Sequence, residues 1–196
     1  MKDKIKLFII IFTAILCSKL TPNLQAQNPN TWTQKSNFGG TARNGAVGFS
    51  IGSKAYMGTG FIGGTTDKDD FWEYNPANNT WAQKANFPGG PREGAVGFSI
   101  GNKGYVGTGW NLGTYYKDFW EYNPSNNTWT QRPNFGGIAR EAAVGFSIGN
   151  KGYIGTGNDA NGTNYKDFWE YDPANNIWTQ KANFGGVARE FAVGIG

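Results

Sequence analysis

Four arginines recur at nearly constant spacing and are the clearest candidates for binding chemistry in the sequence. They follow one another after 49, 48 and 49 residues, at Arg43, Arg92, Arg140 and Arg189. A guanidinium presents its N–H donors in a planar fork that suits carboxylate, phosphate or sugar hydroxyl groups. We therefore expect a ring of arginines that binds a ligand. The alternative is that each arginine pairs with a nearby carboxylate, for example the Glu of "RE" (Glu93, Glu141, Glu190) or of "FWEY" (Glu73, Glu121, Glu170).

Three loops of variable sequence supply the second set of candidates. They span residues 61–69, 110–118 and 158–167, and they include the aromatic residues Trp110, Tyr115, Tyr116 and Tyr165. Variable loops on a repeated scaffold are common places for binding. These rings could stack on a glycan or contact a protein, or they could only cap the edges of sheets. The third loop alternates oxygen-bearing residues but lacks the bidentate Glu of a calcium loop, so we expect no metal there.

Composition excludes several classes of chemistry. The chain has no His and one Cys, Cys17, so neither a Ser–His nor a Cys–His nucleophile can form. We expect no cofactor. Without residues 1–26 the chain has 14 basic and 13 acidic residues. This balance provides no clustered basic surface, and we expect no nucleic-acid partner.

The first 26 residues have the pattern of a signal peptide. Lys2, Lys4 and Lys6 precede the apolar run 7–16, and a small residue, Ala26, stands at a plausible cleavage point. The run is too short to span a bilayer, so we expect export rather than a transmembrane helix. The mature chain would be periplasmic, cell-surface or secreted. A lipid anchor on Cys17 is disfavoured because bulky Leu16 precedes it.

The rest of the chain repeats with a period near 50, which is typical of propeller arrays. Each unit predicts four short strands: "AVGFSI", "KGYVGTG", "DFWEY" and "TWTQRP" in the second copy. The first alternates bulky and small residues, as a strand with two different faces does. In the third strand, Phe119 and Glu121 should face one neighbour, and Trp120 and Tyr122 the other. The sequence thus predicts an all-β propeller of four-stranded blades whose aromatics are buried on both sides.

These units resemble kelch repeats over residues 28–196. The family's Arg, Tyr, glycine pair, Tyr, Asp-Pro and Trp fall on Arg140, Tyr153, Gly155, Gly157, Tyr171, Asp172, Pro173 and Trp178. The glycine pair is split by a Thr, which departs from the family pattern. The resemblance implies a propeller that uses arginines at the mouth of its channel. It also raises two enzymes: a galactose-oxidase-like copper enzyme, excluded by the lack of His, and a sialic-acid-mutarotase-like epimerase that uses Arg and Glu.

The predicted ring is incomplete. Residues 30–38 read as a lone fourth strand, followed by blades at about 39–87, 88–135 and 136–184 and the start of another blade at 185–196. Propellers have about 4–8 blades. We expect either a fragment of a longer propeller or two chains that associate to close a ring. The favoured function is an exported interaction module for a protein or glycan; the epimerase and a purely structural repeat segment stay open.

Overall fold

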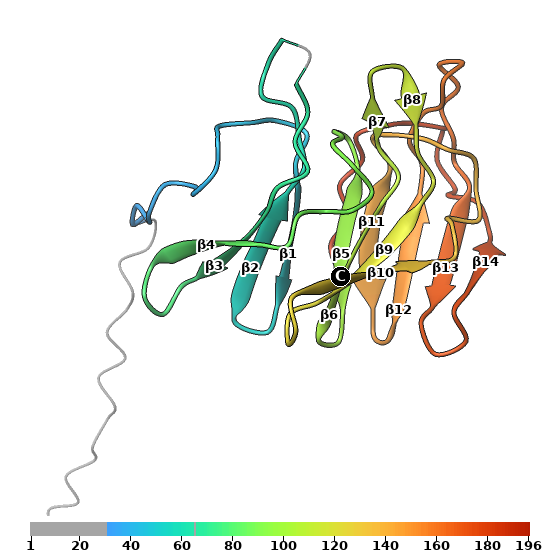
Figure 1. Cartoon of the computed structure of the whole chain (residues 1–196). Coiled ribbons are helices and arrows are strands. Elements are labelled where there is room, and N and C mark those ends of the chain that lie inside the picture. Colours follow the sequence, from blue (N-terminus) through green and yellow to red (C-terminus); the bar gives the residue numbers. More distant parts are fainter. Residues whose placement is uncertain (1–30, 65) are drawn as a thin grey trace, which may run out of the picture. The chain divides into compact units, whose positions relative to one another are not determined.

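The computed structural model describes residues 31–64 and 66–196 and confirms the all-β prediction (Figure 1). Residues 35–196 form one compact unit, and residues 31–34 belong to another. The predicted signal peptide, including Cys17, lies outside the described residues. Within the described ranges, no helix is long and apolar enough to cross a membrane.

Three antiparallel four-stranded sheets form three successive blades. Blade 1 contains β1 (Val47–Ile51), β2 (Lys54–Gly58), β3 (Phe71–Asn75) and β4 (Thr80–Lys84). Blade 2 contains β5 (Val96–Ile100), β6 (Lys103–Gly107), β9 (Phe119–Asn123) and β10 (Thr128–Arg132). Blade 3 contains β11 (Val144–Ile148), β12 (Lys151–Gly155), β13 (Phe168–Asp172) and β14 (Ile177–Lys181). A small hairpin, β7 (Trp110–Asn111) and β8 (Thr114–Tyr115), lies in a loop predicted to be irregular.

The first strands of the blades pack side by side, with β5 between β1 and β11. Small residues permit this close approach. A Cβ on Gly104 of β6 would lie 2.4 Å from the ring of Phe49 in the preceding blade. Backbone bonds also link the blades just before these strands: the Gly94 N–H donates to Gly45 O at 3.0 Å, and the Ala142 N–H to Gly94 O at 2.9 Å. The inner strands of neighbouring blades are therefore closely packed.

Aromatic rings of the third and fourth strands join adjacent blades. The ring centroid of Phe71 lies 4.9 Å from that of Tyr122 and 5.0 Å from that of Trp129 in blade 2. Phe119 of blade 2 repeats this contact with blade 3, at 4.9 Å from both Tyr171 and Trp178. Phe119 thus faces the following blade and Tyr122 the preceding one, as the alternation predicts. Because each ring buries a large apolar area, these contacts supply much of the packing energy.

Hydrogen bonds at the edges of these aromatic contacts explain why Trp and Asn recur in each blade. The indole N–H of Trp129 donates to Ala85 O of the preceding blade at 3.0 Å. The Oδ1 atom of Asn127 accepts from the Ala85 N–H at 2.9 Å and from the Tyr122 hydroxyl at 2.9 Å. The equivalent Asn176 accepts from the Tyr171 hydroxyl at 2.7 Å. It has no interblade donor, because Pro133 stands where Ala85 does and has no N–H.

The two terminal segments are not paired as strands. No strand is assigned to residues 31–38, where a lone fourth strand was expected, or to residues 191–196, where a first strand should begin. A strand needs a hydrogen-bonded neighbour, and among the described residues neither segment has one. Residue 36 instead contacts blade 1, where the Ser36 N–H donates to Asn79 Oδ1 at 2.8 Å.

Asn127→Gly should destabilise the chain by about 1 kcal/mol more than Asn176→Gly, because only Asn127 bonds to the neighbouring blade. Both asparagines have a positive φ, 56° and 58°, so glycine relieves the same backbone strain at each position. Urea denaturation of the two variants measures the difference. Equal losses would show that the interblade bond contributes nothing.

Candidate functional site

Each repeating arginine of blades 2 and 3 lies inside the protein and binds one aspartate. Arg92 has no exposed surface. Its Nη1 donates to Asp118 Oδ1 at 2.5 Å and to Thr108 O at 2.9 Å, and its Nη2 donates to Asp118 Oδ2 at 3.1 Å. Arg140 repeats the arrangement on Asp167 and Thr156, and is also fully buried. We call each such set an arginine clamp.

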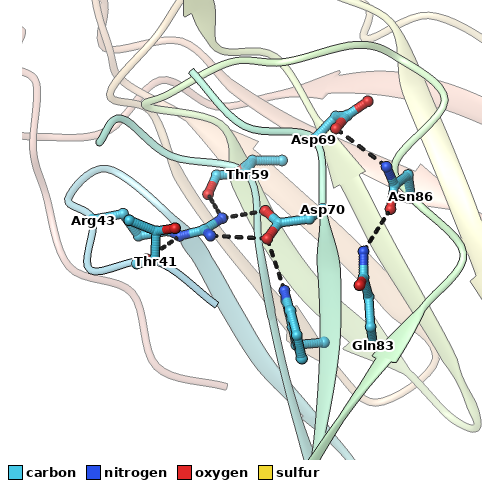
Figure 2. Close-up of polar contacts among 8 residues, drawn as sticks. Thr41, Arg43, Thr59, Asp69, Asp70, Gln83 and Asn86 are labelled. Carbon is cyan, nitrogen blue, oxygen red and sulfur yellow. Dashed lines mark hydrogen bonds and ion pairs between the residues drawn. The ribbon is translucent and has the colours of Figure 1, made fainter. Parts of the chain in front are cut away.

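Figure 2 shows the clamp of blade 1, in which both Nη atoms of Arg43 donate to the carboxylate of Asp70. Arg43 also donates to Thr59 O at 2.9 Å, and the Trp72 indole donates to Asp70 Oδ2 at 2.8 Å. Burial alone would raise the pKa of Asp70. The hydrogen bonds from Arg43 and Trp72 outweigh it and hold the pKa of this carboxyl below its usual value.

Local backbone and stacking explain why the clamp forms in every blade. Thr108, between the two glycines of "GTG", has a φ of 59°, a conformation unusual for a β-branched residue. Its carbonyl accepts from the arginine at the end of strand β6. The guanidinium of Arg92 also lies between two rings, 4.9 Å from the centroid of Phe87 and 3.9 Å from that of Tyr116. Both rings contribute cation–π attraction in a desolvated place.

The alternative, that the arginines pair with carboxylates, holds for Arg43, Arg92 and Arg140, but their partners are not the glutamates named from the sequence. The partner is the Asp immediately before the third strand, and its recurrence in "DFW" at 70, 118 and 167 was the available signal. The glutamates of "FWEY" instead accept from tyrosines, as Glu121 does from the Tyr105 hydroxyl at 3.0 Å. Ligand binding by the arginines stays a prediction, and the complete burial of Arg92 and Arg140 weighs against it.

Arg189 is the exception among the four. Its side chain is exposed, its Nε donates to Val187 O at 3.2 Å, and its guanidinium lies 4.9 Å from the ring of Phe184. Within residues 31–64 and 66–196 it forms no ion pair. The arginine is therefore positioned like the others, but among the described residues no aspartate contacts it.

Two of the three glutamates of "RE", Glu93 and Glu141, lie outside the clamps. They border a cavity of about 350 Å³ lined by Asn44, Gly45, Glu93, Gly94, Glu141 and Phe191. A Cβ on Gly45 would lie 3.1 Å from Glu93 Oε2, and one on Gly94 would lie 3.0 Å from Glu141 Oε2. Each carboxylate thus covers the glycine of the preceding blade. Asp67 interacts with Glu93, and we call Asp67, Glu93 and Glu141 the acidic mouth.

The carboxyl groups of the acidic mouth are held in an unfavourable environment. Burial raises the pKa of Asp67, and one of its oxygens, Oδ1, is buried without a hydrogen-bond partner. Burial and the negative charge of Asp67 raise the pKa of Glu93. Burial and Glu93 raise that of Glu141, although a hydrogen bond from Tyr115 opposes the rise. Carboxylates crowded in this way are typical of functional sites.

A family model for the KLHDC2/KLHL20/DRC7 kelch-repeats domain matches residues 28–192. The chain belongs to the kelch-repeat family. A comparison with curated proteins gives no match. Among solved structures, YjhT is similar, with a TM-score of 0.65 and 20% sequence identity. The match covers 76% of this chain and 54% of the YjhT chain, so this chain spans about half the length of that structure. At this identity the likeness supports the propeller fold alone.

The loop aromatics of this kelch domain have separate roles. Tyr116 and Tyr165 stack on the arginines of the clamps, with the Tyr165 centroid 4.2 Å from the guanidinium of Arg140. Tyr115 is the one placed at the acidic mouth, beside Glu141. Trp110 exchanges two backbone hydrogen bonds with Glu93, both 2.9 Å long. Their roles as ligand contacts stay predictions, for which Tyr115 has the most favourable position.

The loop 158–167 uses its oxygens internally. Asp159 accepts from the N–H groups of Asn161 and Thr163 and from the Tyr165 hydroxyl, at 2.8–3.0 Å. These bonds lower the pKa of Asp159. Across the described part of the chain, no group of three or more His, Cys, Asp or Glu side chains could hold a metal ion.

Arg140→Ala should lower the free energy of unfolding by about 3–5 kcal/mol, because it leaves Asp167 without its buried partner. Arg189→Ala is the matched control and should cost less than about 0.5 kcal/mol, since the side chain is exposed and unpaired. Guanidinium denaturation measures both changes. Similar losses in the two variants would show that the clamp is not the source of the stability.

Glu141→Gln should raise the melting temperature at pH 7. The pKa of this carboxyl is higher in the folded state than in the unfolded state, so its charged form destabilises the fold at pH 7. The carboxyl contributes favourably to stability below its unfolded pKa, and this contribution is lost as the pH rises through the folded pKa. The amide keeps an oxygen to accept from Tyr115 but carries no charge. Scanning calorimetry at pH 7 and pH 3.5 tests this, and the gain should disappear at the lower pH. A gain that persists there would refute the electrostatic cause.

Proposed function

We propose that this chain is an exported kelch-type interaction module that binds a protein partner at the loop face. The acidic mouth receives a Lys or Arg side chain of that partner. One observation carries the proposal: Glu93 and Glu141 line an open cavity, Asp67 acts electrostatically on Glu93, and burial raises the pKa of all three carboxyl groups.

The crowding of these carboxylates opposes folding, so its retention needs a compensating role. Within the protein, Glu93 and Glu141 form no ion pair among the described residues, whereas Glu73, Glu121 and Glu170 each have a Lys or Arg partner. A cationic side chain inserted between Glu93 and Glu141 would relieve their repulsion.

The scaffold supports a preformed site. The backbone of Glu141 exchanges hydrogen bonds of 3.0 and 3.1 Å with Asn158, as that of Glu93 does with Trp110. The residues that follow them, Gly94 and Ala142, each donate a backbone hydrogen bond to the preceding blade. Because the two glutamates extend from this fixed backbone, a partner need not order the loops before it binds.

A peptide array probed with the full chain tests the proposal. Peptides that carry Lys or Arg should bind, and replacing that residue by norleucine or citrulline should abolish the signal. Glu141→Gln should weaken binding at least tenfold, which is about 1.4 kcal/mol. Binding should also weaken as salt rises, because an exposed ion pair is screened.

Asp172→Asn is the control, because it removes the same charge at the turn end of blade 3, where Asp172 pairs with Lys151. This variant should bind like the unmodified chain. Equal weakening by the two variants would indicate a general charge effect and would reject the acidic mouth. Binding only on a parallel glycan array would replace the protein partner with a glycan.

The same carboxyls favour one second candidate, a sugar epimerase. Raised pKa values at Glu93 and Glu141 suit a general acid and a general base, which mutarotation requires. The buried arginines of the predicted Arg–Glu pairs could not take part directly. Exchange between the anomers of sialic acid, followed by NMR, separates the candidates: acceleration that Glu141→Gln removes would favour the enzyme.

A further inference from the structure

The tip of the β7–β8 hairpin exposes a leucine in an unfavourable backbone conformation. Leu112 is 67% exposed and has a φ of 46°, and Gly113 after it has a φ of 86°. Positive φ at both central residues fits a type I′ turn, in which Asn-Gly or Gly-Gly is strongly preferred. Blade 2 lies between blades 1 and 3, so both neighbouring blades are present and still leave this side chain uncovered.

The equivalent loops of blades 1 and 3 turn without this strain. Positive φ at the described residues of loops 61–69 and 158–167 falls only on glycines: Gly63, Gly64 and Gly162. Glycine adopts these angles at no steric cost. Leu112 therefore serves neither the turn, where its Cβ is unfavourable, nor the core, from which it points away. A residue that breaks a local rule without benefit to the fold indicates a role in contacts with another molecule.

The hairpin that carries Leu112 is fixed against the acidic mouth. At its base, Trp110 and Glu93 exchange two backbone hydrogen bonds, both 2.9 Å long. On its second strand, the Tyr115 side chain is hydrogen-bonded to Glu141. Because one short hairpin is bonded to both glutamates of the cavity, its tip keeps a defined position relative to them.

The pairing of the hairpin sets a spacing. Trp110 pairs with Tyr115 and Asn111 with Thr114, so Leu112 stands two residues beyond the Trp110–Tyr115 pair. At about 3.3 Å per residue, this distance is roughly 7 Å. An extended chain that runs alongside covers it in two residues, and side chains two residues apart lie on the same face of an extended chain. A partner whose cation enters the acidic mouth can thus place the side chain two residues away on Leu112.

We propose that Leu112 determines specificity by contacting an apolar side chain of the partner, two residues from the Lys or Arg that the acidic mouth receives. This inference rests on the proposed function and narrows it to partners that present a basic and an apolar residue in an extended segment. The mouth supplies charge complementarity, and Leu112 supplies apolar area. A lipid surface is a poorer occupant, because the carboxylates beside the hairpin would repel anionic headgroups.

An array of short peptides probed with the full chain tests the spacing. Each peptide has a single Arg in a Gly/Ser background and one Leu at a distance of one, two or three residues on either side. A peptide with Arg alone is the reference. Leu two residues from the Arg should strengthen binding about tenfold over this reference. Leu adjacent to the Arg should add little, because it points to the opposite face of an extended chain.

Leu112→Asn separates the contact from the stability of the hairpin. Asparagine suits a positive φ before glycine, so this variant should melt at a temperature higher by roughly 1–3 °C. It should nevertheless lose the tenfold advantage of the Leu peptides and bind the reference peptide as before. Opposite changes in melting temperature and affinity cannot arise from misfolding.

Ile177→Thr is the matched control. Ile177 is 51% exposed, and Thr80 and Thr128 occupy the same position in the other blades. It begins β14 at the turn end, away from the β7–β8 hairpin (Figure 1). The variant removes an exposed apolar side chain like that of Leu112 and should bind every peptide like the unmodified chain.

The outcomes distinguish this inference from the function on which it rests. Arg-dependent binding with no gain from Leu would overturn the inference and leave the acidic mouth in place, whereas binding that ignores the Arg would reject both. An advantage that Leu112→Asn retains, or that Ile177→Thr also loses, would place the apolar contact elsewhere and overturn the inference. Self-association of the chain in sedimentation velocity that Leu112→Asn abolishes would assign Leu112 to a second copy and reject a separate partner.

Discussion

Every blade of this protein has two apolar faces that only another blade can cover, and the rest of the structure depends on this constraint. Phe71 and Phe119 are fully buried because Tyr and Trp rings of the next blade enclose them. A four-stranded sheet with no helix against it has no other way to remove these rings from water. The indole and asparagine groups at the edges then satisfy polar atoms that the same packing would isolate.

The arginine clamps lie at the same junctions between adjacent blades. Each guanidinium binds the aspartate and threonine of its own blade's sheet while it stacks on the aromatic ring that ends the preceding blade. A buried pair of this kind fixes how successive units join. The residues with the most obvious chemistry therefore maintain the architecture. Glu93 and Glu141, which follow two of these arginines in the sequence, line a cavity instead.

Particular residues show how far sequence reasoning reached. The period, the strands and the opposite directions of Phe119 and Tyr122 followed from alternation and recurrence, and the structure confirms them. The carboxylate partners of the arginines were misidentified. Glu93 and Glu141 are adjacent to arginines in sequence, but they extend to the mouth, whereas Asp118 and Asp167 lie 26 and 27 residues away and reach the guanidinium. Where the chain reverses direction between strands, residues that are adjacent in sequence need not be the ones that form an ion pair.

The sequence by itself determined the repeat, the all-β class and the burial of aromatics on both faces, because these depend on local periodicity and residue type. Only the tertiary structure decided which charges are paired. Pairing depends on which side chains the folded loops bring together, and in the sequence the recurring Asp of "DFW" could not be told apart from the recurring Glu residues. The same physical reason separates Arg140 from Arg189: their surrounding sequences are nearly alike, yet one has an aspartate against it and the other faces the open side of blade 3.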